Sequence, residues 1–168
     1  MKRIIFLFFI LVSSLFSAEI LGKNYKEISK LVQEVCPIKN VDIEKHKDWA
    51  GYVELKDGSI VALSSSKYTF AYMLIVQKRE GQDSVKNIYV TDYKSKKLID
   101  ANTAYYVFGS NIMSVGGDDL IPFSLENDAK EFFKVNNGNL KITKDKIDLD
   151  FEINEVPQII KNISIVLK

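Results

Sequence analysis

The sequence is poor in the residues that most often carry covalent or acid–base chemistry. It has a single cysteine, Cys36, and a single histidine, His46. One cysteine excludes an intramolecular disulfide, so its thiol is buried, paired with another chain, or used as a soft metal ligand. One histidine gives no basis for a Ser–His–acid site, and nothing in the sequence orients Cys36 and His46 toward each other as a hydrolytic pair. We therefore expect a protein that is not an enzyme.

Neither sign of charge is in excess, because 23 Lys and Arg residues face 22 Asp and Glu residues, and 46% of the chain is hydrophobic. These values are typical of an ordinary globular protein. The aromatic residues (8 Tyr, 10 Phe and 1 Trp) are explained by core positions, since an aromatic platform for nucleic acid needs a basic surplus around it. We expect no nucleic-acid partner.

The N-terminal apolar run is too short to span a bilayer. It covers residues 4–12, follows Lys2 and Arg3, and leads to small residues that end at Ala18. This arrangement is typical of a secretory signal. We expect residues 1–18 to be removed, leaving residues 19–168 as one exported, soluble periplasmic domain with no stable membrane insertion. No cysteine near the cleavage point could carry a lipid, so the protein is not expected to be a lipoprotein. An uncleaved membrane anchor is the alternative.

After the signal, the first half of the chain reads as helix, hairpin, helix and strand. Apolar spacing predicts an amphipathic helix over 24–35 that ends before Pro37. The pair Asp57–Gly58 predicts the turn of a hairpin, and Ser64–Ser66 can cap a helix that runs through Val76. A strand over 85–93 completes this series.

The second half repeats this order. Residues 98–108 are expected to be mostly extended and 120–123 to form a short strand. A helix near 125–136 turns four apolar side chains inward, and a strand over 140–143 closes the series; the four are Ala129, Phe132, Phe133 and Val135. Alternation of apolar and charged residues over 147–153 suggests one more strand. The sequence thus predicts an α+β fold of two repeated ββαβ units, about 48–93 and about 97–143, and favours an internal duplication. Chance similarity between two amphipathic helices is the competing explanation.

Three segments in fixed order carry a family resemblance: YVTDY at 89–93, LIDA at 98–101 and AYYV at 104–107. Together with Cys36-Pro37, Trp49 and the Asp57–Gly58 hairpin upstream, they resemble the NosL family, the periplasmic copper carriers that serve as nitrous-oxide-reductase accessory proteins. The resemblance implies paired ββαβ units, as in organomercurial lyase. It also implies a copper chaperone whose partner is a copper enzyme or its maturation machinery in the periplasm.

The family's soft metal ligands do not transfer to this sequence. Its Cys-Gly-Met motif falls on residues 39–41 and its Pro-Met-Gly motif on residues 115–117, and neither stretch contains sulfur. The nearest sulfur atoms belong to Cys36 and Met113, and Cu(I) prefers thiolate and thioether ligands. We therefore expect a shifted Cu(I) site of Cys36 and Met113, to which His46 adds a nitrogen and Met73 a second thioether.

Two alternatives to the shifted site remain open. The sulfur residues can be core filling and His46 an exposed loop residue, since a lone cysteine is commonly a small buried hydrophobe. The chain would then be a paralogue that has lost its ligands and acts as a protein-interaction module without metal. Asp118 and Asp119 follow a glycine turn, where acidic side chains usually accept hydrogen bonds from their own backbone, so a hard-cation site there is less favoured.

Overall fold

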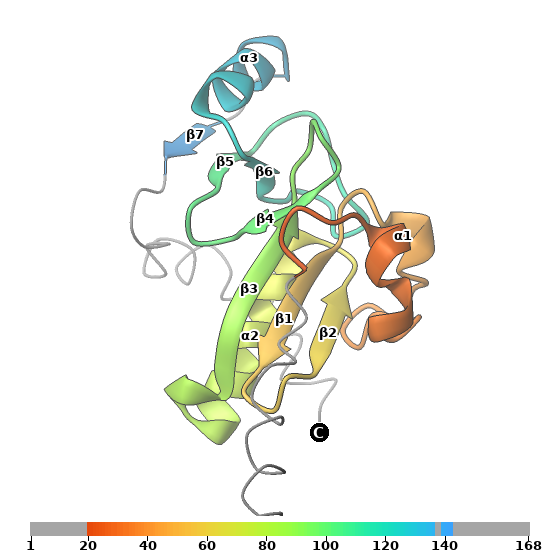
Figure 1. Cartoon of the computed structure of the whole chain (residues 1–168). Coiled ribbons are helices and arrows are strands. Elements are labelled where there is room, and N and C mark those ends of the chain that lie inside the picture. Colours follow the sequence, from red (N-terminus) through yellow and green to blue (C-terminus); the bar gives the residue numbers. More distant parts are fainter. Residues whose placement is uncertain (1–19, 137–138, 143–168) are drawn as a thin grey trace, which may run out of the picture.

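The computed structural model describes residues 20–136 and 139–142, which form two antiparallel sheets, each accompanied by one long helix (Figure 1). The first sheet has the strand order β2-β1-β3-β4 and the second the order β6-β5-β7. Mixed helices and antiparallel strands confirm the α+β class. The strands are β1 Gly51–Leu55, β2 Ile60–Leu63, β3 Val85–Thr91, β4 Leu98–Asp100, β5 Tyr105–Phe108, β6 Ile121–Phe123 and β7 Asn139–Ile142. The helices are α1 Tyr25–Ile28, α2 Ser66–Glu80 and α3 Glu126–Asn136, with the 3-10 turns η2 Ser29–Leu31, η3 Glu44–His46 and η4 Gln82–Ser84.

The first hairpin and α2 begin where local sequence rules place them. The Asp57 carboxylate accepts a hydrogen bond from the Ser59 backbone N–H at 2.9 Å, and Gly58 takes the positive φ of 87° that the turn requires. Ser65 caps α2 by accepting from the Tyr68 backbone N–H, as the run of three serines predicts. The helix ends at Glu80, four residues beyond the predicted end, and its C-cap Gly81 has a positive φ of 97°.

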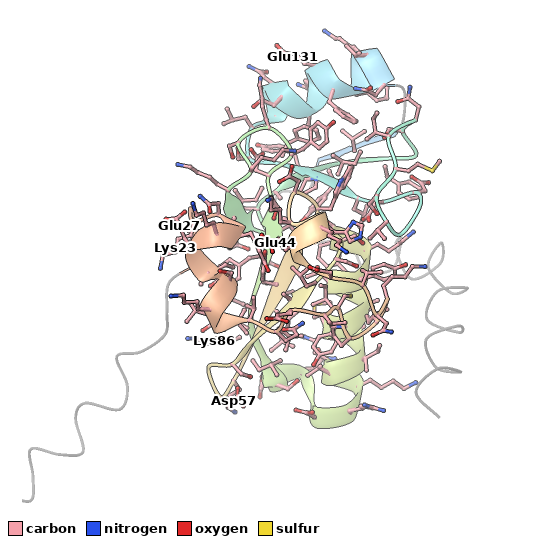
Figure 2. All side chains as sticks on the ribbon, turned by 90° about the vertical axis from the view of Figure 1, so that its right-hand side faces the viewer. Lys23, Glu27, Glu44, Asp57, Lys86 and Glu131 are labelled. Carbon is pink, nitrogen blue, oxygen red and sulfur yellow. The ribbon has the colours of Figure 1, made fainter. Side chains whose placement is uncertain are left out.

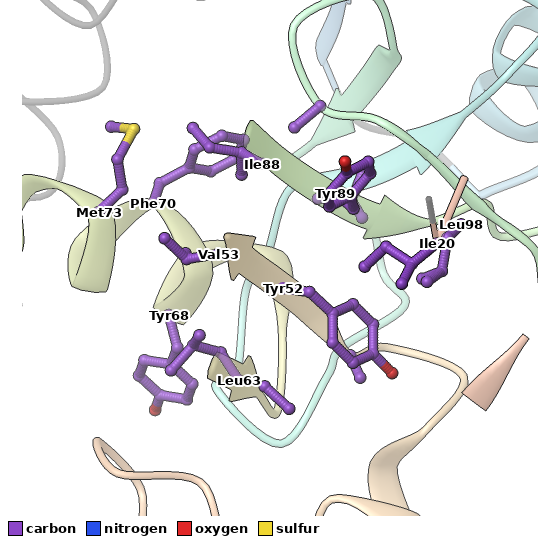
Figure 3. Packing of buried hydrophobic residues seen from close by; sticks show 14 of the residues in the cluster. Ile20, Tyr52, Val53, Leu63, Tyr68, Phe70, Met73, Ile88, Tyr89 and Leu98 are labelled. Carbon is purple, nitrogen blue, oxygen red and sulfur yellow. The ribbon is translucent and has the colours of Figure 1, made fainter. Parts of the chain in front are cut away.

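Helix α2 packs closely on one face of the first sheet. Figure 3 shows Val53 pointing toward α2, while the neighbouring Tyr52 points to the opposite side of the strand, as the two-residue period of a strand requires. The contact is tightest at Gly51, where a Cβ atom would lie 2.1 Å from the Thr69 hydroxyl oxygen. Only glycine at position 51 leaves room for the first turns of α2, so the start of the helix lies directly against β1.

The N-terminal segment covers the opposite face of the sheet. The helix predicted over 24–35 is wrong for most of this segment. An Asn24–Glu27 capping box starts α1, but the helix ends at Ile28, and after η2 the chain is extended. The reason is tertiary. Gln33 uses its side-chain amide to bond both the N–H and the C=O of Ala62 on the edge strand β2, which an extended backbone allows. The free edge of the sheet is thereby partly protected.

The second half is organised around a smaller apolar cluster between α3 and its sheet, made of Val107, Ile121, Phe123, Ala129 and Phe132. Two expectations are wrong here. Phe133 and Val135 are 36% and 78% exposed instead of turning inward, because α3 lies on three short strands and buries only its central stripe. The stretch 98–108 does not form one extended strand, because a turn after Asp100 sends β4 and β5 into different sheets.

Two buried aspartates join the halves. Asp92, which follows β3, accepts from the Ser124 backbone N–H at 2.7 Å, just before α3. Asp119, which precedes β6, accepts from the Lys67 backbone N–H at 2.8 Å, in the first turn of α2. Each half therefore supplies a carboxylate to the segment at the start of the other half's helix. Both aspartates are buried, with 1% of each residue exposed.

Both halves follow the order strand, strand, helix, strand, and their origin by duplication stays a prediction. The expected signal over 1–18 and the expected strand over 147–153 lie outside the described residues. Within the described ranges, none of the helices is long and apolar enough to cross a membrane.

Candidate functional site

Three segments meet at the first turn of α2: the loop 36–41, the start of the helix, and the loop 114–119. Tyr68 is their common neighbour. It belongs to the same buried cluster as Cys36, and a Cβ atom on Gly116 would lie 3.3 Å from its ring carbon Cε2. Val115 packs against that cluster as well. Cys36 of the first loop and Gly116 of the second therefore both lie near Tyr68.

Cys36 lies in the interior. Its residue is 0% exposed, and its turn is closed by hydrogen bonds from the Cys36 N–H to the Val41 C=O and from the Asn40 N–H to the Cys36 C=O. Asn40 takes a positive φ of 57° to make this turn. The thiol sulfur accepts a weak contact from the Lys39 N–H at 3.5 Å. A metal ion would reach this sulfur only after one of the surrounding loops had moved.

The other predicted ligands occupy different surroundings. Met73 is 5% exposed and packs in the same cluster as Cys36, whereas Met113 is 62% exposed and lies outside it. His46 is half-buried at the end of η3 and is not part of that cluster either. Over residues 20–136 and 139–142, no three His, Cys, Asp or Glu side chains are gathered closely enough to hold a metal ion. The copper site of Cys36, Met113 and His46 therefore stays a prediction.

The loop 114–119 is a tight turn. Ser114 and Gly117 exchange two backbone hydrogen bonds, at 2.9 and 3.0 Å, and Gly117 takes the φ of 81° that such a turn needs. The Ser114 hydroxyl accepts from the Gly116 N–H at 2.9 Å. The turn is thus well defined by its own backbone, and its position on the protein is decided by contacts with α2.

Lys67 supplies the first of these contacts. Its ammonium group donates to the Gly116 C=O at 2.7 Å and also to the Asp118 C=O. A lysine in the first turn of a helix is disfavoured by the helix dipole, so this residue needs a compensating partner elsewhere. Sequence reasoning missed Lys67, although its unfavourable place in the predicted helix was a signal that could have found it.

Asp119 supplies the second contact, in the reverse direction. Its carboxylate accepts from the Lys67 N–H and the Leu120 N–H, both at 2.8 Å, and from the Ser114 hydroxyl. Burial raises the pKa of the Asp119 carboxyl, and hydrogen bonds from Ser114, Ser65 and the two backbone N–H groups oppose that shift. The local backbone bond expected from its turn is present, yet the carboxylate also caps a helix that lies 52 residues away in sequence.

Residues of both loops affect the pKa of the Tyr68 hydroxyl. Burial raises the pKa of its hydroxyl, and the negative charges of Asp119 and of an ionised Cys36 act in the same direction. At ordinary pH the Tyr68 hydroxyl is therefore protonated and neutral.

A groove of about 920 Å³ lies elsewhere, between α1, the region of η3 and the turn 95–97. Its lining mixes lysines with acidic residues, including Lys26, Lys30, Glu34, Asp42 and Glu44. Figure 2 looks onto the α1 side of the molecule, with Glu44 labelled. None of the four predicted copper ligands lines this groove.

Comparison with known proteins decides the family. The family model described as NosL matches residues 28–150, which include both loops and α2. The chain belongs to the NosL family. This confirms the resemblance carried by the three sequence segments, and it places residues 36–41 and 115–117 inside the NosL-matched region.

A solved NosL structure has the same fold. The protein resembles the crystal structure of the copper chaperone NosL from Shewanella denitrificans with a TM-score of 0.52 and 21% sequence identity, over 64% of this chain and 85% of that one. At this identity the likeness establishes the shared fold. No curated protein matches the chain.

Proposed function

We propose that this NosL protein is an exported periplasmic accessory protein that carries Cu(I) to a copper enzyme, nitrous-oxide reductase, or to its maturation machinery. It acts as a carrier and not as an enzyme. Family membership supports a copper-chaperone-like role. The observation that carries the proposal is the convergence of the loops 36–41 and 114–119 on Tyr68, at one end of α2.

In this proposal the Cys36 thiolate is the principal ligand, the Met113 thioether the second and the His46 imidazole the third. Sulfur ligands suit the soft Cu(I) ion, and an incompletely filled sulfur site suits transfer to a partner. Because Cys36 is 0% exposed, binding requires the two loops to part. Because the thiol must lose its proton to bind, the apparent affinity is expected to rise with pH.

The test is a Cu(I) titration of the reduced protein, residues 19–168, against a coloured Cu(I) chelator. We expect one equivalent of Cu(I) to be bound, with binding lost in Cys36→Ala and weakened in Met113→Ala and His46→Ala. Leu125→Ala serves as the matched control for Met113→Ala, since Leu125 is an apolar side chain of similar exposure that carries no ligand atom. Met73→Leu tests the second thioether. Absence of binding would remove the proposed activity, and binding that survives both Cys36→Ala and Met113→Ala would remove the proposed ligands.

A second function, a protein-interaction module without metal, is favoured by the ammonium of Lys67. This group already donates to two carbonyl oxygens of the loop where the family's Pro-Met-Gly motif would stand. The module would bind the same copper enzyme directly. Binding of the purified enzyme, measured with and without an excess of Cu(I) chelator, separates the two functions: equal affinity in both conditions and in Cys36→Ala supports the module, and a loss on chelation supports the carrier.

A further inference from the structure

We propose that Lys67 and Asp119 form a latch that holds the loop 114–119 closed against the first turn of α2, and that opening of this latch controls access to the Cys36 thiol. The inference deepens the proposed function and rests on it for its biological meaning, because it names the step that admits Cu(I) to the principal ligand. Its physical content is a local opening motion that can be measured without copper.

The latch consists of contacts in both directions between the same two segments. From the helix, the Lys67 ammonium donates to the C=O groups of Gly116 and Asp118. From the loop, the Asp119 carboxylate accepts from the Lys67 backbone N–H, in the turn where the helix dipole favours a negative charge. Hydrogen bonds that involve a charged group are stronger than neutral ones, so these contacts contribute much of what holds the loop in place.

Apart from the latch, the loop has modest apolar contact with the rest of the molecule. Val115 is only half-buried, and the preceding Met113 is 62% exposed. Segments with few buried apolar contacts open locally at a free-energy cost well below that of global unfolding. Loss of the latch is therefore expected to release this loop while the two sheets stay folded.

The loop bears on Cys36 through Tyr68. Gly116 approaches the Tyr68 ring so closely that a Cβ atom would meet ring carbon Cε2 at 3.3 Å and the Lys67 side-chain carbon Cε at 3.2 Å. Tyr68 is 8% exposed and shares a packed cluster with Cys36. A closed loop thus keeps the Tyr68 ring against the interior. Once the loop leaves, the ring is free to swing outward and uncover the thiol.

The test measures how fast an aromatic disulfide reagent reacts with Cys36 in the reduced protein, residues 19–168, under native conditions. Lys67→Met keeps the aliphatic stem and removes the ammonium, and we expect it to react about tenfold faster or more, from the loss of hydrogen bonds to a charged group. Lys67→Arg keeps a cation and is expected to remain near the wild-type rate. Lys78→Met is the matched control, since Lys78 is an exposed lysine of the same helix.

Gly116→Ala gives a second, independent variant. Its added methyl group would lie 3.2 Å from the Lys67 Cε atom and 3.3 Å from both Ser114 Oγ and Tyr68 Cε2, so these neighbours must move by a few tenths of an ångström and the contacts of the latch are loosened. This variant too is expected to react faster. Urea is used to check that opening is local: the wild-type rate should change little at low urea concentrations, where global unfolding would raise it steeply. The latch is overturned if Lys67→Met and Gly116→Ala react at the wild-type rate, or if the wild-type rate follows global unfolding. Faster reaction of both variants without any Cu(I) binding would keep the latch and remove the carrier function.

Discussion

Replacement of Gly51 by alanine tests how tightly α2 is held against the first sheet. The added Cβ atom would lie 2.1 Å from the Thr69 hydroxyl oxygen, 3.0 Å from its Cβ and 3.1 Å from its methyl carbon. Ordinary contacts of this kind are more than an ångström longer than the first distance. Thr69 cannot simply turn away, because it is 0% exposed and its hydroxyl donates to the Ser65 C=O at 2.8 Å.

The expected cost of Gly51→Ala has two parts. Forcing an extra methyl group into a well-packed interior costs about 1–3 kcal/mol, since side chains and backbone must shift. Turning Thr69 to relieve the clash breaks its hydrogen bond to Ser65, which adds about 1 kcal/mol. We therefore expect the free energy of unfolding to fall by about 2–4 kcal/mol.

The assay is urea unfolding followed by far-ultraviolet circular dichroism. With an m-value of about 2 kcal/mol/M, the midpoint should fall by about 1–2 M. Gly58→Ala is the matched control: it has open space around it, so only its positive φ costs energy, about 1 kcal/mol. Thr69→Ala removes the hydroxyl oxygen and the methyl carbon, two of the three nearest atoms. The double variant with Gly51→Ala should therefore be more stable than the sum of the singles predicts, by about 1 kcal/mol. If Gly51→Ala proves no worse than Gly58→Ala, or the double variant is additive, the steric argument fails.

Three further predictions concern buried polar groups. Asp92→Ala should cost about 1–2 kcal/mol in urea unfolding, because the backbone N–H groups of Ser95 and Ser124 lose their acceptor, and Asp92→Asn should cost less. Burial raises the pKa of the Asp119 carboxyl above 3.8, so the folded protein binds the carboxyl proton more tightly than the unfolded chain does. As the pH falls through the raised pKa toward 3.8, the wild-type protein should therefore gain stability relative to Asp119→Asn. A loss of stability relative to that variant would refute the shift. Burial and the hydrogen bond to Glu54 raise the pKa of Tyr89 from 10.0 to about 12, so the free energy of unfolding should decline between these pH values. Absorbance at 295 nm should show a tyrosine that ionises well above pH 10. Titration of every tyrosine near pH 10 would contradict this prediction.

Much of the local architecture follows from short-range rules. The Asp57–Gly58 turn and the serine cap of α2 depend on backbone geometry within a few residues, and each is found at its predicted place. Periodicity likewise predicted the α+β class. These features could be anticipated because their energetics are complete within one turn or one hairpin.

Other features depended on partners distant in sequence. The helix predicted over 24–35 is shorter than expected because the Gln33 side chain forms hydrogen bonds with the Ala62 backbone. Nothing in the sequence of residues 24–35 predicts that partner. Phe133 is half outside the core because α3 has only three short strands to cover. Periodicity shows that a face is apolar, but the extent of burial depends on the area of the opposing surface.

Some features of the candidate site were likewise predictable from the sequence, and others depended on tertiary structure. Sequence resemblance alone located the loops 36–41 and 115–117 and led to the NosL family, because motif order is a property of the chain. The burial of Cys36, the exposure of Met113 and the exchange between Lys67 and Asp119 were decided by tertiary structure, since each depends on which segments the two sheets bring together. A charged side chain or a thiol has one chemistry in solution and another in a packed interior, and only the folded arrangement determines which of the two it has.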